Sequence, residues 1–106
     1  MSLNFPERDW KHFRKIREAA LERFCRGILD SVSEISKAPE GKAHETYLQL
    51  YKLIHQKDDE LGHAFNDMRR STALMQILIM NSKGLFTKEE IAGFTPEIQA
   101  YITEFR

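Results

Sequence analysis

The sequence predicts an all-α fold, a single-domain helical bundle of about five helices with a long first helix, a central helical hairpin and two short C-terminal helices. No segment of the 106 residues alternates apolar and polar residues over any length, and valine, which favours strands, occurs once. Apolar residues instead recur at helical spacing. Helix caps, glycines and prolines divide the chain into the successive helices.

Length and composition limit the kinds of partner. A chain of 106 residues that is 42% hydrophobic and 30% charged is typical of one folded domain with a single core. Lys plus Arg equals Asp plus Glu at 16 each, so no net field favours nucleic acid or an anionic membrane surface. The longest nearly apolar run, residues 73–80, is interrupted only by Gln76 and is less than half of the roughly 20 residues that a membrane-spanning helix needs. We therefore expect neither nucleic acid nor a membrane as a partner.

The single cysteine, Cys25, cannot form an internal disulfide, and no basic and then apolar leader opens the chain. The expected compartment is the cytoplasm. We interpret Cys25 as a small hydrophobic residue at the edge of the core rather than as a reactive nucleophile. No phosphate-binding glycine loop or nucleophile elbow occurs, so the sequence favours binding over catalysis and predicts no cofactor.

The first helix is predicted from Asn4, a favourable N-cap, to about Lys37, with Pro6 in its first turn. Its apolar residues recur on one side, at Trp10, Phe13, Ala20, Leu21, Phe24, Ile28, Val32 and Ile35. Pro39 and Gly41 then form a loop.

The length of this helix has a consequence for assembly. A helix of about 32 residues is roughly 48 Å long, whereas a compact domain of this size has a radius of gyration of about 13 Å. The helix should overhang its own core, unless Gly27 kinks it. A symmetric homodimer, in which the exposed apolar end packs on another chain, is the expected solution. A kinked monomer is the alternative.

One charge, Arg17, lies within the apolar stripe of the first helix. A buried charge requires a partner, and the candidates are Asp67 or a carboxylate of a second chain. Alternatively its stem reaches water, or the guanidinium binds an anionic ligand.

The central hairpin is predicted as residues 42–57 followed by residues 58–83. The first of these helices is amphipathic, and its apolar face carries Tyr47, Leu50, Tyr51 and Ile54. Asp58, Asp59 and Glu60 resemble an N-cap with an acidic first turn, which predicts a tight break between the two helices. One continuous helix is the alternative.

Local signals at the C-terminal end are clearer. Gly84 can take the left-handed conformation that ends the third helix. In "FTKEEI", Thr87 and Glu90 form a capping box that starts a short helix. In "FTPEI", Thr95 is the cap and Pro96 the first position of the last helix.

The apolar stretch 73–80 is predicted to be core surrounded by the other helices, or else an adaptable groove for a partner helix. The residues proposed for an interface are Leu74, Met75, Leu78 and Ile79. The leading functional hypothesis is a small interaction or regulatory module that acts by protein–protein association.

The alternative hypothesis is a metal- or anion-binding protein. On a continuous third helix, spacings of four, four and three place Asp59, His63, Asp67 and Arg70 on one face, with Glu60 beside them. Carboxylates around an imidazole can hold a divalent metal, and Arg70, with Arg17, could bind an anion. The same spacing also fits an ordinary ladder of surface charges.

Overall fold

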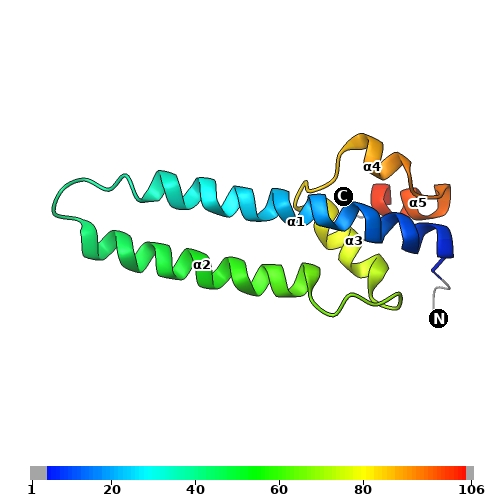
Figure 1. Ribbon diagram of the computed structural model, residues 1–106, viewed down its shortest axis with the longest axis horizontal. Coiled ribbons are helices and arrows are strands. Elements are labelled where there is room, and N and C mark those ends of the chain that lie inside the picture. The colour runs from blue at the N-terminus through cyan, green and yellow to red at the C-terminus, as the bar shows by residue number, and fades with distance from the viewer. Residues whose placement is uncertain (1–4, 105–106) are drawn as a thin grey trace.

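The computed structural model describes residues 5–104, which form five helices and, within that range, no strand (Figure 1). The predicted all-α fold is confirmed. The helices are α1 (Glu7–Ile35), α2 (Ala43–Phe65), α3 (Ala73–Ser82), α4 (Lys88–Ala92) and α5 (Pro96–Glu104).

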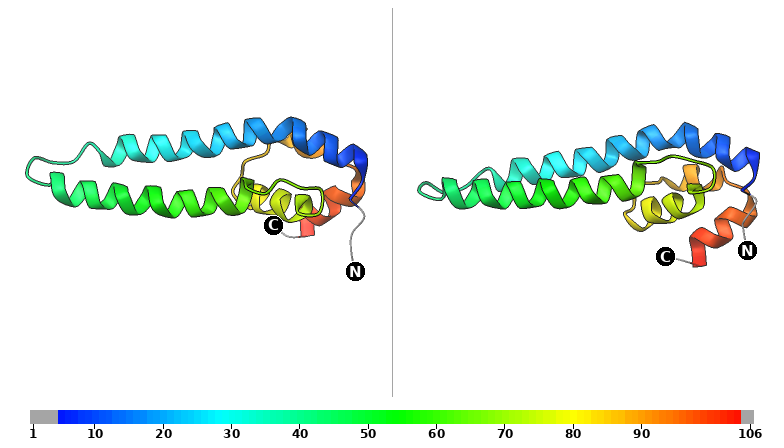
Figure 2. Two further views of the ribbon diagram at one scale, coloured as in Figure 1. Left: turned by 60° about the horizontal axis from the view of Figure 1, so that its bottom comes forward. Right: turned by 90° about the horizontal axis from the view of Figure 1, so that it is seen from below.

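The molecule is an elongated hairpin with a globular end. α1 and α2 run antiparallel, and α3, α4 and α5 gather around the first half of α1 (Figures 1 and 2). The principal extents are 55 × 26 × 23 Å and the radius of gyration is 16.9 Å, compared with about 13 Å for a compact domain of this length. α1 continues through Gly27 as one helix, so it overhangs the globular end as predicted.

The hydrophobic core lies wholly at the globular end. Its largest fully buried apolar side chains are Phe13, Phe65, Phe94, Ile77, Met80 and Ile98. Between Phe24 and Ala64, a stretch that the structure describes completely, no residue is buried. We call residues 25–63 the arm.

The predicted break at Asp58 is wrong, because α2 continues to Phe65. Asp58 and its acidic neighbours are compatible with a helix interior, and nothing there interrupts the backbone. The helix ends where Phe65 enters the core, Asn66 becomes extended (ψ 157°) and Asp67 takes a left-handed φ of 57°. Asp tolerates that conformation because its short side chain bonds locally.

The predicted helix ends are partly confirmed. Asn4 lies outside the described residues, and Pro6 occupies the N-cap position of α1. After α3, Gly84 has a φ of 70°, as predicted. Its N–H donates to the carbonyl of Asn81 at 2.9 Å, and the N–H of Leu85 donates to that of Met80 at 3.1 Å. These two bonds form a Schellman motif.

α3 is mainly core. Ala73, Ile77 and Met80 are buried, and so is Gln76, whose amide donates to the carbonyl of Asn66. The expectation that the whole stretch is surrounded is wrong for Met75, which is 69% exposed.

The C-terminal helices are fastened to α1 by polar groups. The predicted capping box is confirmed, and Glu90 also accepts two hydrogen bonds from Arg23. Asp9, which is fully buried, accepts from the N–H of Thr95 at 2.7 Å and from its hydroxyl at 2.8 Å. A carboxylate of α1 therefore holds the start of α5.

Gly93→Ala is expected to destabilise this junction. A Cβ at position 93 would lie 2.3 Å from the ring of His12. That ring cannot easily move, because its Nε2 is 2.6 Å from the carbonyl of Glu90 and it packs edge-on against Phe94 at 4.7 Å. Overpacking costs about 1–3 kcal/mol, which corresponds to a fall in Tm of roughly 4–24 °C in a domain of this size.

Thermal denaturation followed by circular dichroism measures this effect. The matched control is Gly27→Ala, because a Cβ there meets nothing within 4 Å and alanine favours the helix. The control should melt at or above the wild-type Tm. Equal melting of the two variants would contradict the close contact between Gly93 and His12.

Candidate association surface

The structure separates the residues of the predicted metal cluster. Asp59 and His63 lie on α2, where the Nδ1 of His63 is 2.8 Å from the carbonyl of Asp59. The expectation that Asp67 and Arg70 share their face is wrong, because α2 ends at Phe65. Among residues 5–104, no three His, Cys, Asp or Glu side chains gather closely enough to hold a metal ion.

The charged groups after α2 have partners within the chain. Arg70 donates to the carbonyl of Phe5 at 2.8 Å and to the carboxylate of Glu7 at 2.7 Å, which ties the α2–α3 loop to the start of α1. Asp67 pairs with Arg69 at 2.6 Å. The structure therefore gives Arg70 a structural role.

The predicted pairing of Arg17 with Asp67 is also wrong. Arg17 donates to the backbone carbonyl of Phe65 at 2.8 Å, and its guanidinium lies 5.4 Å from the centre of the Phe65 ring. The last carbonyls of a helix carry a partial negative charge. The end of α2 thus replaces the carboxylate that we expected.

A polar groove of about 400 Å³ lies where the arm joins the globular end, and its charged lining residues are Arg23, Lys57, Glu60 and Lys83. Glu60, predicted as a metal ligand, instead pairs with Lys57 and Lys83. The hydrogen bond from Lys83 outweighs desolvation and lowers the pKa of Glu60. The pair with Lys83 fastens the start of the α3–α4 loop to α2.

Glu90 of α4 pairs with Arg23, which lines this polar groove. Burial raises the pKa of its carboxyl, but the hydrogen bonds from Arg23 and Thr87 outweigh burial and leave the pKa below its ordinary value. Glu90 is therefore an ionised carboxylate that joins the capping box to α1.

Acid should weaken the contacts that Glu60 and Glu90 make with their basic partners. Since the folded state lowers the pKa of both Glu60 and Glu90, their ionisation stabilises the protein above the ordinary value of about 4.5, and this contribution is lost as the pH falls through the folded pKa values. We expect the free energy of unfolding, measured with urea, to fall below about pH 4.5. The slope should be smaller in Glu60→Gln and in Glu90→Gln. An unchanged slope in both variants would contradict the assignment.

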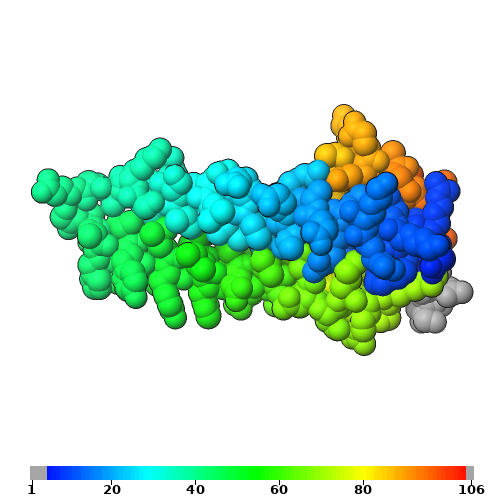
Figure 3. All heavy atoms as spheres, viewed as in Figure 1, coloured from blue at the N-terminus to red at the C-terminus, as the bar shows by residue number. Residues whose placement is uncertain are grey.

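Most of the exposed large apolar side chains lie on the arm. They are Leu29, Tyr47, Leu48, Tyr51 and Ile54, and their exposed fractions lie between 44% and 61%; outside the arm, Met75 of α3 is also exposed. Side chains of α2 stand out along the free edge of the arm (Figure 3). A groove of about 380 Å³ runs along this helix, lined by Tyr47, Leu50, Tyr51, Ile54, His55 and Asp58.

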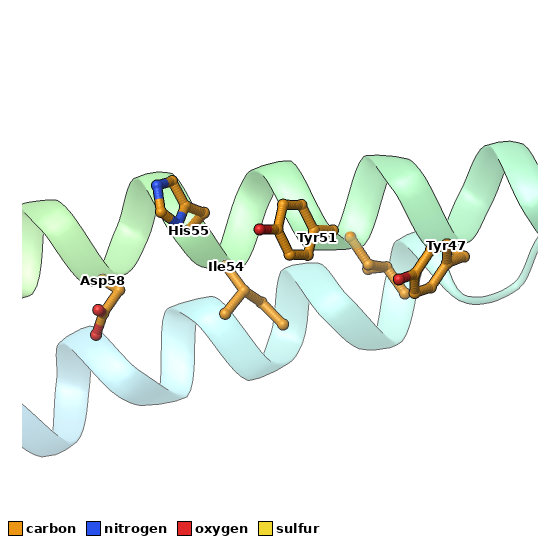
Figure 4. Close-up of a pocket in the computed structure, with 6 residues that line it drawn as sticks. Tyr47, Tyr51, Ile54, His55 and Asp58 are labelled. Carbon is orange, nitrogen blue, oxygen red and sulfur yellow. The ribbon is translucent and has the colours of Figure 1, made fainter.

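The groove residues form a second stripe beside the one that faces α1. Tyr47, Tyr51, Ile54 and Asp58 follow one another at intervals of four, three and four, so they lie on one side of α2 (Figure 4). Toward α1, the inner positions such as Leu50 and Leu53 are only half-buried. α2 thus carries two parallel stripes, and α1 covers one of them.

Leu29 of α1 lies on the same side of the hairpin as this stripe. The polar groove is lined by Gly27 and Glu60, which marks the opposite side. Successive residues advance by about 100° around a helix, so Leu29 faces away from Gly27 and Ile54 faces away from Glu60. We call Leu29, Tyr47, Tyr51 and Ile54 the arm face.

The residues proposed from the sequence for an interface lie elsewhere. Leu74, Leu78 and Ile79 are partly buried against the core, and Met75 alone stands out. The arm face was not proposed from the sequence for association, although its apolar pattern is visible there. The spacing of four, three and four in α2 is the pattern of a helix face that can pack against another helix.

No protein-family model, curated protein or solved structure matches this chain. Within residues 5–104, no helix is both long and apolar enough to cross a membrane. The function must therefore be inferred from the chain's own surface.

Proposed function

We propose that this protein is a small helical association module that joins a second copy of itself through the arm face. The observation that carries the proposal is an arm without a buried residue that nevertheless exposes an apolar face. Most helical stability in proteins comes from the packing of an apolar face rather than from helix propensity. A second copy packed on the arm face would bury the apolar side chains that a single hairpin leaves exposed.

The accessible surface of the chain supports this proposal. It is 7427 Å², whereas a compact monomer of 12.4 kDa exposes about 6,100 Å². The excess of roughly 1,300 Å² is larger than the roughly 800 Å² that each partner covers in a standard interface. The surface available on one chain is thus enough for a stable dimer.

The chemistry of the arm face is that of an interface. Tyr47 and Tyr51 are each 61% exposed, and tyrosines are enriched where proteins meet because their rings are large and carry a polar tip. His44 stacks on Tyr47 and His55 on Tyr51, with ring centres 6.4 Å and 6.1 Å apart. These stacks orient both rings before a partner binds.

Sedimentation equilibrium over a range of protein concentrations tests the proposal. We expect a mass of twice the 12.4 kDa of the chain at high concentration and dissociation on dilution. A mass of one chain at every concentration would contradict the proposed function.

A further inference from the structure

We infer that the two copies pair with their α2 helices antiparallel, so that Tyr47 lies opposite Asp58 of the partner subunit and Tyr51 opposite Ile54 of the partner subunit. This inference rests on the proposed function and adds the orientation and register of the pair.

The spacing of the stripe suits this register. Intervals of four, three and four are the alternation of the two core positions in a coiled coil, and in an antiparallel pair each position of one type faces the other type. A two-fold axis that passes between residues 52 and 53 exchanges position 47 with 58 and position 51 with 54. The stripe therefore complements itself, as a symmetric interface requires.

The two kinds of residue pair that this register creates, Tyr51 with the partner's Ile54 and the partner's Tyr47 with Asp58, are chemically matched. Tyr51 against the partner's Ile54 places an aromatic ring on a branched aliphatic side chain. Asp58 lines a groove that is otherwise mostly apolar, and covering a carboxylate there is costly without a donor. The hydroxyl of the partner's Tyr47 is such a donor, and a hydrogen bond to an ionised acceptor is a strong one.

The charges of α2 favour the same orientation. Its second half carries three carboxylates, those of Asp58, Asp59 and Glu60, against Lys57, while in its first half Glu45 and Lys52 cancel. A parallel pair would place the two acidic halves side by side. The antiparallel pair places each acidic half beside a neutral half, and it opposes the two helix dipoles.

This register also keeps the globular ends apart. Within α2, position 62 lies opposite position 43 of the partner subunit, so each globular end lies beside the tip of the other arm. The bulk of α3, α4 and α5 lies at the far end of the molecule from this tip (Figure 1), and the two globular ends therefore do not compete for space.

Disulfide trapping tests the register. In a Cys25→Ser background, which removes the native thiol, Tyr47→Cys and Asp58→Cys proteins are oxidised separately and as an equimolar mixture. We expect covalent dimers in the mixture and few in either protein alone. Eleven residues separate the two positions, so two thiols at position 47 would lie roughly 16 Å apart along the axis, beyond the Cα separation of about 4.4–6.8 Å that a disulfide allows.

The outcomes separate this inference from the proposed function. A dimer mass before oxidation with links between two positions 47 would overturn the antiparallel register and leave association intact. Monomers before oxidation in the Cys25→Ser background, without further change, would overturn both.

A second measurement tests the register without the cysteine substitutions, which themselves remove side chains of the interface. Tyr47→Phe and Asp58→Asn should each raise the dimer Kd by about a hundredfold, because a symmetric dimer loses two hydrogen bonds to a charged group, and the double variant should be little worse than either. Fully additive effects on binding would show that the two groups do not meet, and would overturn the register.

Discussion

Replacement of Asp9 by alanine is expected to lower the free energy of unfolding by about 2–6 kcal/mol. Asp9 is fully buried in α1, and its two oxygens accept from the N–H and the hydroxyl of Thr95. Without the carboxylate, both donors at the start of α5 lose their partner in a part-buried place. The cost of each unsatisfied donor, about 1–3 kcal/mol, exceeds the net gain from an ordinary hydrogen bond.

Urea denaturation followed by circular dichroism, at one protein concentration, measures the change. Asp9→Asn keeps an oxygen that can accept from the Thr95 N–H, so it should lose less stability than the alanine variant. The control is Asp30→Ala, which removes an exposed carboxylate from the same helix and should stay within about 0.5 kcal/mol of wild type. If the two alanine variants were equally stable, Asp9 would not hold α5.

Tyr51→Glu is expected to raise the Kd of the dimer by at least about a hundredfold, because aromatic residues central to an interface often contribute 2 kcal/mol or more. Each dimer would lose two such rings and would cover two carboxylates that face Ile54 of the partner subunit. Since Tyr51 is 61% exposed in the single chain, the fold of each copy should persist.

Sedimentation equilibrium of Tyr51→Glu beside Gln56→Glu measures this effect. Gln56 is an exposed residue of the same helix, and at about 100° per residue it lies on the other side of α2 from the arm face. Circular dichroism should show equal helix content in both. Equal dimer affinity of the two variants would contradict a role for the arm face.

Features of the fold that depend on neighbouring residues could be predicted from the sequence. The capping box of Thr87 and Glu90 and the left-handed Gly84 each need only partners within a few residues. The overhang of α1 followed from its length alone. In these cases the local chemistry decides the structure.

Features set by distant contacts could not be predicted. The acidic run from Asp58 to Glu60 has the composition of a helix start, yet α2 ends later, where Phe65 reaches the core. Thr95 is 86 residues from Asp9, and no periodicity indicates that they meet. Arg17 donates to the backbone carbonyl of Phe65, and the pattern of side chains in a sequence does not indicate such a partner.

The candidate site was predictable only in part. The sequence shows that α2 is apolar along Tyr47, Tyr51 and Ile54, but it does not show how much of this face α1 covers. The same difficulty affects α3, whose apolar residues looked available for association while most of them pack against the core. Exposure depends on which stripe each neighbouring helix occupies.

Hydrogen–deuterium exchange of the wild-type protein at two concentrations tests most directly whether the arm face joins two copies. Pairing should raise the free energy needed to open the arm. We expect the amides of residues 46–58 to exchange more slowly at the higher concentration, while those of α4 and α5 stay unchanged. The two concentrations are chosen below and above the one at which the dimer is expected to form. If the arm amides exchanged at the same rate at both, the proposed association would be contradicted.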